Sequence, residues 1–298
     1  MCPVPERVKR MRMKNQWLLC VVTVLAACGA ADEAPNQTKQ AKQEEGVNVG
    51  KASALRKLVP AEGIERQAEQ QYAQLKRQVA QQRALAPEHH PELVRLRTIA
   101  ERIIPHATRF NPRAAKWQWE VNLIGSSQIN AFCMPGGKIA FYTGILRNLK
   151  LTDDEVAMVM GHEIAHALRE HAREQASKNA LTKLGAVGLS IATGGKYDGL
   201  VHTGANLLSL NYSRSDETDA DLVGLDIAAR AGYDPRAGIS LWKKMSAASK
   251  GAPPQWLSTH PSGPSRIREI ERHLAEVLPL YERAAKPRPV VAPGEMRR

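Results

Sequence analysis

Aromatic residues are scarce in this sequence, and their scarcity limits what the chain can bind. Phe, Trp and Tyr make up 5% of the 298 residues, so the core must be built mainly from aliphatic side chains and Met. The formal net charge of +12 could suit a nucleic acid or an anionic membrane surface. Nucleic-acid surfaces, however, interleave aromatic with basic residues, and the sequence has no such pattern. We therefore predict no nucleic-acid partner.

Hydrophobic runs long enough to cross a membrane are also missing, and the most continuous run is Trp17–Ala27. It falls short of the roughly 20 residues that span a bilayer but fits the about 7–15 of a secretory signal. Basic residues precede it, and Leu25–Cys28 resembles the lipobox of bacterial lipoproteins. That resemblance implies cleavage before Cys28, lipid attachment to Cys28 and, because Gly29 follows, a lipid anchor in the outer membrane facing the periplasm. The alternative is an ordinary signal peptide cut at the same small residues.

Cysteines are few. Cys2 and Cys20 belong to the predicted signal peptide and Cys28 to the predicted anchor, which leaves Cys133 as the one thiol of the mature chain. An intramolecular disulfide is therefore excluded. Cys133 is either buried, as free cysteines commonly are, or available for a bridge to another molecule.

What the sequence does contain is apolar periodicity typical of helices, with a few short alternating segments. Thr152 and Glu155 form a capping box that starts a helix, and Pro279 is expected to end the last one. An apolar segment over 180–195 is predicted to be a buried helix rather than a substrate lid. Helices are predicted over 61–83, 91–104, 152–173, 213–231 and 264–278, and strands over 117–124, 128–134 and 138–143. The predicted fold class is α+β, with a small antiparallel sheet packed on the capped helix.

The capped helix carries the pattern His162-Glu163-x-x-His166. Residues four apart lie on one helix face, about 5–6 Å apart at Cβ, so both imidazoles can bind one zinc ion. Glu163 borders the same face and can take a proton from the attacking water. The pattern predicts a metallopeptidase site that still needs a third ligand.

Two segments could supply the third ligand. His171 lies nine residues after His162, but the metzincin spacing would require Gly and His where Arg169 and Ala172 stand. We therefore expect His171 to be a surface histidine. In the second segment Glu217 and Asp221 share a helix face, so one carboxylate can bind zinc while the other accepts the outer N–H of a ligand histidine. The alternative for this pair is a solvated acidic helix start.

Several ordered motifs over about residues 90–275 resemble the HtpX and CAAX-prenyl-protease family of gluzincin metallopeptidases, in particular its periplasmic lipoprotein branch (LoiP-like and BepA-like proteins). The matching segments are Asn130–Phe132, Pro135–Gly137, Thr143–Leu146, Gly161–His166, Ser213–Asp221 and Ser258–Ser262. Integral members of the family have transmembrane helices, and no stretch of about 18 apolar residues is present here. Too few residues follow in this sequence for a BepA-like C-terminal repeat domain, so none is expected in it.

The resemblance implies one Zn²⁺ per chain, held by His162, His166 and Glu217, with Glu163 as general base and Asp221 in the outer shell. It also implies that Asn130, Ala131 and Phe132 form a strand that binds extended substrate backbone. The implied partners are unfolded or misassembled envelope proteins and, beyond them, the outer-membrane assembly machinery.

The predicted function is a zinc metalloendopeptidase of protein quality control. The competing hypothesis is a zinc-stabilised chaperone or assembly factor with little turnover. Glu163 argues against it, because a purely structural zinc site needs no general base and usually has four protein ligands.

His260 precedes Pro261, which favours an extended backbone and a side chain projecting from a loop. From the sequence alone, a loop histidine bonded to nearby backbone is the simpler interpretation. The resemblance adds two functional roles, because the corresponding histidine of BepA-like relatives approaches the zinc. His260 would then donate a hydrogen bond to the oxyanion, or occupy the fourth zinc position and inhibit the enzyme.

The predicted organisation follows from these assignments. Residues 1–27 are a lipoprotein signal peptide and 28–50 a flexible tether. Residues 51–90 form an N-terminal helical segment, 91–281 the zinc metallopeptidase domain, and 282–298 a basic, disordered tail.

Overall fold

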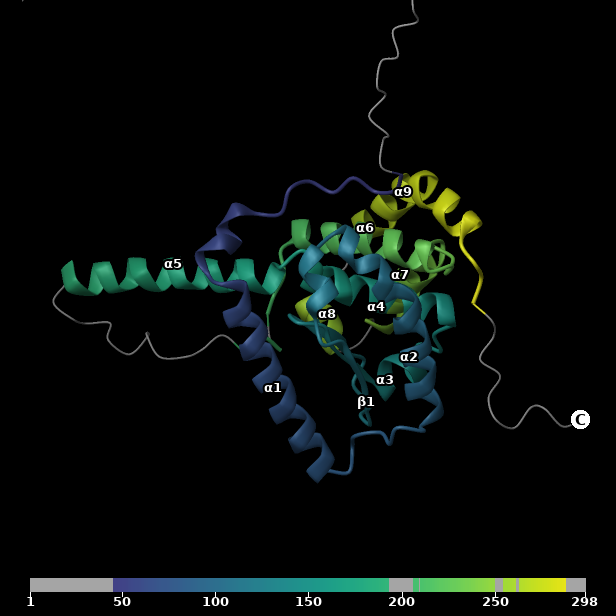
Figure 1. The fold of residues 1–298 in the computed structure, drawn as a ribbon, viewed down its shortest axis with the longest axis horizontal. Coiled ribbons are helices and arrows are strands. Elements are labelled where there is room, and N and C mark those ends of the chain that lie inside the picture. Colours follow the sequence, from purple (N-terminus) through teal and green to yellow (C-terminus); the bar gives the residue numbers. More distant parts are fainter. Residues whose placement is uncertain (1–44, 193–205, 209, 250–253, 261–262, 288–298) are drawn as a thin grey trace, which may run out of the picture. The chain divides into compact units, whose positions relative to one another are not determined.

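The computed structural model describes residues 45–192, 206–208, 210–249, 254–260 and 263–287, and in these ranges helices surround a three-stranded sheet (Figure 1). The strands are β1 Glu120–Ile124, β2 Ala131–Met134 and β3 Lys138–Tyr142. The helices are η1 Ala54–Leu58, α1 Ala61–Gln81, α2 Pro91–Ile103, η2 Ile104–Arg109, η3 Pro112–Lys116, α3 Thr143–Asn148, α4 Asp153–Leu168, α5 His171–Ala192, α6 Arg214–Arg230, α7 Ala237–Ala248, α8 Gln255–Thr259 and α9 Pro264–Arg283. The predicted α+β fold is confirmed. None of the helices in the described ranges is both long and apolar enough to cross a membrane.

The sheet is mixed rather than antiparallel throughout. β2 and β3 form the expected antiparallel hairpin, and its turn uses Gly136 and Gly137 at φ +84° and +80°, where a side chain would be strained. β1 pairs in parallel with the other edge of β3. The loop that joins β1 to β2 therefore crosses the end of β3, and β2 forms on the far side of that strand. β2 is therefore an edge strand of the described sheet, packed against α4.

The capped helix begins as predicted but ends earlier. Thr152 Oγ1 accepts from the Glu155 amide at 3.3 Å, and Glu155 Oε2 accepts from the Thr152 amide at 2.9 Å. The prediction that this helix runs to Arg173 is wrong, since α4 ends at Leu168. Glu170, at φ +59°, turns the chain into the separate helix α5. Nothing in the residue types marked this turn, because Glu is a good helix former.

Two further helix predictions need correction. α9 continues through Pro279 to Arg283, although proline removes one backbone hydrogen bond. The buried Val277 and Leu280 hold this last turn against the core. The apolar segment over 180–195 is helical to Ala192, but Leu181 is 45% exposed, so the start of the segment is not buried as predicted. The side chains of 183–192 and the structure of 193–195 lie outside the described residues.

The first described residues lie against the domain. Val47 is buried, and its N–H donates to Asp226 Oδ2 at 3.0 Å. The end of the predicted tether thus packs against α6. Residues 1–44, with the predicted signal peptide and Cys28, lie outside the described residues, and the predicted domain boundaries stay predictions.

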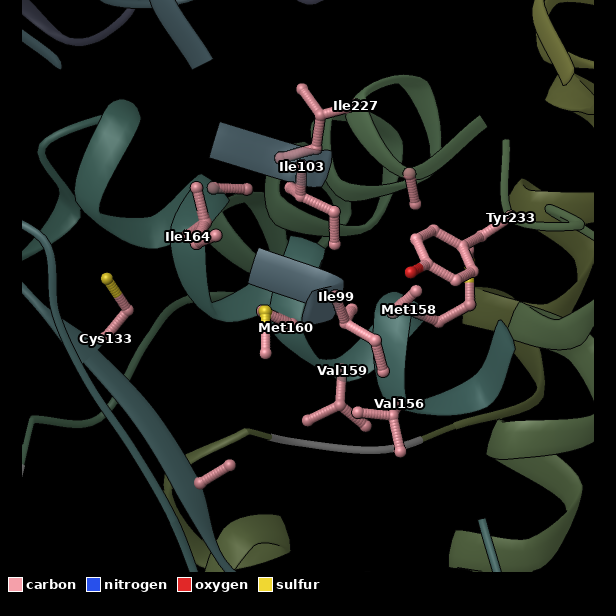
Figure 2. Packing of buried hydrophobic residues seen from close by; sticks show 14 of the residues in the cluster. Ile99, Ile103, Cys133, Val156, Met158, Val159, Met160, Ile164, Ile227 and Tyr233 are labelled. Atoms are coloured by element: carbon pink, nitrogen blue, oxygen red, sulfur yellow. The ribbon is translucent and has the colours of Figure 1, made fainter. Parts of the chain in front are cut away.

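The core is aliphatic and Met-rich, as the shortage of aromatic residues predicts. Figure 2 shows Ile99 and Ile103 of α2 facing Val159 and Met160 of α4, with Ile227 of α6 close by. All five side chains are no more than 1% exposed. Helices α2, α4 and α6 therefore form one packed unit around α4.

Helices α4 and α6 approach so closely that their backbones touch. A Cβ atom on Gly161 would lie 2.7 Å from the Gly224 carbonyl oxygen, and a Cβ on Gly224 would lie 2.7 Å from the His162 amide nitrogen. Contacts below 3.0 Å require the backbone to move. Both positions are in mid-helix, where alanine is normally the better residue, so their glycines serve the close approach.

We predict that Gly161→Ala lowers the free energy of unfolding by about 1–3 kcal/mol, because the added methyl group forces the two helices apart. Gly63→Ala in α1 is the matched control, since a Cβ there has nothing within 4 Å. The control should leave stability unchanged or raise it by up to about 1 kcal/mol. Urea unfolding of both variants measures the difference, and equal stability of the two would refute the packing argument.

Candidate metal centre

Four buried side chains meet at the junction of α4, α6 and the end of α8. His162 and His166 come from α4, Glu217 from the first turn of α6, and His260 from the residue that follows α8. Their candidate ligand atoms all lie within 4.8 Å of one another, and each residue is at most 3% exposed. The structure thus brings together the three ligands expected from the resemblance and His260.

The spacing of the donor atoms suits a small tetrahedral cation. His162 Nε2 lies 3.1 Å from His166 Nε2, and each of these nitrogens lies 3.5 Å from one Glu217 oxygen. Zinc ligands at about 2.0–2.1 Å in a tetrahedron lie about 3.3 Å from one another. Two imidazoles and a carboxylate are also a typical donor set for zinc, so the residues present fit this metal.

His162 is fixed from its outer side by Asp221. Its Nδ1 lies 3.1 Å from Asp221 Oδ1, so the ring donates there and keeps Nε2 free for a metal. Arg266 of α9 holds both oxygens of Asp221 at 2.6 Å, and its Nη1 donates to Glu217 Oε2 at 2.5 Å. Glu217 Oε1 is the oxygen that faces His166 and His260. The outer role expected for Asp221 therefore agrees with the geometry.

These contacts explain how two carboxylates stay ionised in a buried site. Burial opposes the charge on Asp221, but Arg266 and His162 outweigh it and lower the pKa of Asp221 to about 2. Burial likewise opposes the charge on Glu217, whereas the hydrogen bond with His260 and the nearby His162 and Arg266 lower its pKa. Both groups thus remain available as anions at neutral pH.

Arg266 was missed by the sequence reasoning. It stands in an arginine-rich amphipathic helix, where a buried arginine looks like its exposed neighbours. Its guanidinium also stacks on the Trp242 ring, 3.7 Å from the centroid. The one available signal was its position, because Arg266 follows the candidate residue His260 by only six residues.

His171 is not the surface histidine that was predicted. It is 4% exposed, and its Nδ1 lies 2.9 Å from Nδ1 of His166. The turn at Glu170 brings His171 back against α4. A helix continuing to Arg173, as predicted, would have directed His171 away from His166. Burial holds the pKa of His171 below the ordinary histidine value, and burial with the neighbouring imidazoles holds that of His166 well below it.

Glu163 lies beside the cluster and contacts two groups. Trp256 Nε1 donates to Glu163 Oε1 at 2.6 Å, and His260 Nε2 lies 3.5 Å from the same oxygen. Trp256 is fully buried and stacks on His260. Sequence reasoning missed Trp256. The only feature that could have pointed to it is that aromatic residues are rare in this chain.

His260 takes the extended backbone expected before proline, at φ −119° and ψ 90°. It is nevertheless buried and lies among the candidate ligands, with Nδ1 3.0 Å from Glu217 Oε1 and 3.2 Å from His162 Nε2. Burial alone would lower the pKa of His260, but the carboxylates of Glu163 and Glu217 raise it. The simple loop-histidine interpretation is therefore wrong.

The edge strand β2 runs next to this cluster. A cavity beside it is lined by Asn130, Ala131 and Phe132 together with Glu163 and His260. The predicted substrate strand and the candidate general base thus face one space. Cys133, on the same strand, is buried and free, and burial raises the pKa of its thiol well above the ordinary value.

Comparison with known proteins then decides the family. The model of Peptidase family M48 matches residues 92–274, which is more than half of the chain. The chain belongs to peptidase family M48. The predicted metallopeptidase is thereby confirmed at the level of the family, and all four clustered residues lie within the matched range.

Relatives of this M48 chain include two kinds of named protease. It is 38% identical to the mitochondrial metalloendopeptidase OMA1 of Arabidopsis thaliana over 169 residues, 55% of this chain and 33% of the relative. It is 34% identical to that of Schizosaccharomyces pombe over 198 residues, 64% and 56% of the two chains. The beta-barrel assembly-enhancing protease of Yersinia pestis is 27% identical over 215 residues, 67% and 43%. The match thus spans between a third and just over half of these relatives.

The relatives contradict the predicted location in the outer membrane. Those from Arabidopsis thaliana, Bos taurus and the two yeasts are named mitochondrial metalloendopeptidases, not outer-membrane lipoproteins. The prediction depended on residues 1–29. A basic N-terminal segment with few acidic residues is common to secretory signals and organelle targeting peptides, so it does not identify one membrane.

We predict that Asp221 makes the metal-free protein sensitive to acid. Its pKa of about 2 lies below the ordinary value of 3.8, so its ionised form stabilises the fold above about pH 4. That contribution, about 2 kcal/mol, is lost as the pH falls towards 2. Unfolding free energies between pH 5 and pH 3 should therefore fall less steeply in Asp221→Asn than in the wild type.

Asp154→Asn is the control of opposite sign, because burial raises the pKa of Asp154. Removing that carboxyl group should make the loss of stability in acid steeper. Parallel pH profiles for the wild type and Asp221→Asn would contradict the assignment.

Proposed function

We propose that this M48 chain is a zinc-dependent endopeptidase that hydrolyses peptide bonds in unfolded or misassembled proteins. The observation that carries the proposal is the buried set of His162, His166 and Glu217 donors at tetrahedral spacing, with Glu163 alongside. The relatives named metalloendopeptidases support it. Because the chain spans at most 56% of the relatives compared above, its activity and substrates are inferred from the site.

In this proposal each residue has a distinct task. His162, His166 and Glu217 hold the metal, which when bound polarises a peptide carbonyl and lowers the pKa of water. Glu163 accepts the proton of the attacking water and delivers it to the leaving amine. Trp256 keeps the Glu163 carboxylate oriented through its 2.6 Å hydrogen bond.

The position of β2 at the edge of the described sheet supports an unfolded chain as substrate. An extended peptide can add to a sheet edge through backbone hydrogen bonds that need no particular side chains. Asn130, Ala131 and Phe132 line the cavity that also contains Glu163, so such a peptide would pass the catalytic carboxylate. A folded protein offers few extended segments with free backbone groups.

We predict that Glu163→Gln abolishes hydrolysis of an unfolded substrate such as casein but keeps zinc binding and the fold. The amide preserves the shape of the side chain and cannot accept the proton, so a loss of at least about 100-fold is expected. Zinc content by mass spectrometry and cleavage by gel measure the two effects. Glu69→Gln is the control, because Glu69 is exposed on α1.

The outcomes separate the competing functions. A Glu163→Gln variant that cleaves as fast as the wild type would contradict the general-base assignment. Zinc-loaded wild type that prevents aggregation of the substrate but does not cleave it would favour the chaperone hypothesis.

We further propose that His260 restrains the enzyme as a fourth ligand. Its Nδ1 stands 3.0–3.2 Å from two other donor atoms, close to the edge length of the zinc tetrahedron, which favours a ligand over an oxyanion donor. His260→Ala should therefore raise the turnover of an unfolded substrate. A 10²–10³-fold loss, typical of a missing oxyanion donor, would reverse the assignment. Unchanged turnover at unchanged zinc content would exclude both roles.

We also propose membership of the lipoprotein branch and an interaction with assembly machinery. Assignment of this chain to the lipoprotein branch of the family depends on lipidation of Cys28, which lies outside the described residues. Interaction with assembly machinery is suggested by the name of the Yersinia pestis relative, beta-barrel assembly-enhancing protease.

A further inference from the structure

His171 is a buried histidine for which the proposed reaction has no task. It does not belong to the group of four candidate ligands, yet its Nδ1 lies 2.9 Å from the Nδ1 of His166. The two rings meet nearly perpendicularly, with centroids 5.0 Å apart. Two buried imidazoles at this distance form a hydrogen bond with a defined direction.

The local fold brings His171 to this position. On a continuous helix a residue five positions after His166 would lie about 140° around the axis, too far to touch it. The left-handed Glu170 breaks the helix and starts α5 so that His171 points back to α4. Arg169 steadies the turn, because its guanidinium pairs with Asp219 at 2.7 Å.

The direction of the hydrogen bond follows from the metal side. A neutral imidazole has one N–H and one lone pair. His166 Nε2 faces the candidate ligands, 3.1 Å from His162 Nε2, so its lone pair must be there and its N–H on Nδ1. His166 therefore donates to His171 Nδ1. His171 in turn carries its proton on Nε2, which faces the carboxylates of Asp216 and Asp219 at 3.9 and 4.0 Å.

We propose that His171 is a positioning residue that fixes the tautomer and the ring plane of His166 for metal binding. This inference rests on the metal centre of the proposed function. His162 has a carboxylate, Asp221, as its outer partner, whereas His166 has a neutral imidazole. Tyr212 stacks on the His166 ring, with centroids 3.9 Å apart, so the ring is held from its face as well as from its edge.

The two outer partners leave different charges next to the metal. Asp221 is ionised, and Arg266 balances its charge. The carboxylate of Asp216 lies on the far side of the His171 ring, and is therefore about one ring width further from the metal centre. His171 thus orders His166 without adding a further buried carboxylate next to the ligand histidines. Outer partners of ligand histidines typically change metal affinity by 10–100-fold.

The test compares two substitutions with opposite expectations. His171→Phe keeps the ring volume but removes the acceptor, so we expect zinc affinity to fall about 10–100-fold. His171→Asn loses volume but can place its Oδ1 near the position of Nδ1, so its zinc affinity should stay within about threefold of the wild type. Competition with a chromogenic chelator measures the affinity, and the melting temperature of the metal-free protein reports packing.

A purely structural role would reverse the order. Phe would then bind zinc normally, and Asn would lose most through its cavity. Equal zinc affinity of His171→Phe and the wild type, or an equal loss in both variants, overturns the inference. His106→Phe is the control, since His106 lies on η2 outside the metal cluster. Wild type that binds no zinc would instead contradict the metal centre itself.

A measurement on the wild type keeps the inference testable if His171→Phe does not fold. Nitrogen-15 NMR of the zinc-loaded protein distinguishes protonated from unprotonated ring nitrogens. The expected result is a His171 ring protonated at Nε2 and unprotonated at Nδ1. The opposite tautomer would make His171 the donor and overturn the inference.

Discussion

The metal centre depends on the direct contact between helices α4 and α6 at Gly161 and Gly224. Glu217, Asp221 and Gly224 recur at intervals of three or four residues, so they share the face of α6 that meets α4. The glycine contact lets that face come close enough for Glu217 and Asp221 to reach the two sides of His162. Side chains larger than hydrogen at the crossing would separate the carboxylates from the imidazole.

Such a centre concentrates charge among buried side chains, and the surrounding groups compensate. Buried ions are costly unless they are paired and hydrogen-bonded. Arg266 pairs with Glu217 and Asp221 at once, which ties α9 to the ligands on α6. His171, a neutral side chain, contacts the outer nitrogen of His166, as the charged Asp221 does for His162. The inner ligands are thus held by residues from three helices, α5, α6 and α9, so the arrangement of the site depends on the packing of the whole domain.

The sequence predicted what is local and missed what depends on distant contacts. Ligands four residues apart on one helix, the capping box and the acidic face with Glu217 follow from helix geometry, so they could be read directly. The environment of His171 could not, because it requires a left-handed turn at Glu170 that its residue type does not signal. Arg266 reaches the site from about 50 residues along the chain. The parallel pairing of β1 likewise depends on the path of a loop, and strand alternation does not encode it.

The central claim is that one metal ion is held by His162, His166 and Glu217. Anomalous diffraction at the zinc edge, from crystals of the purified protein, tests it most directly. We expect one strong peak per chain, about 2.0–2.1 Å from Nε2 of both histidines and about 2.0–2.2 Å from Glu217 Oε1. A peak held by residues outside the cluster of His162, His166, Glu217 and His260, or crystals grown with zinc that show no peak there, would contradict the account.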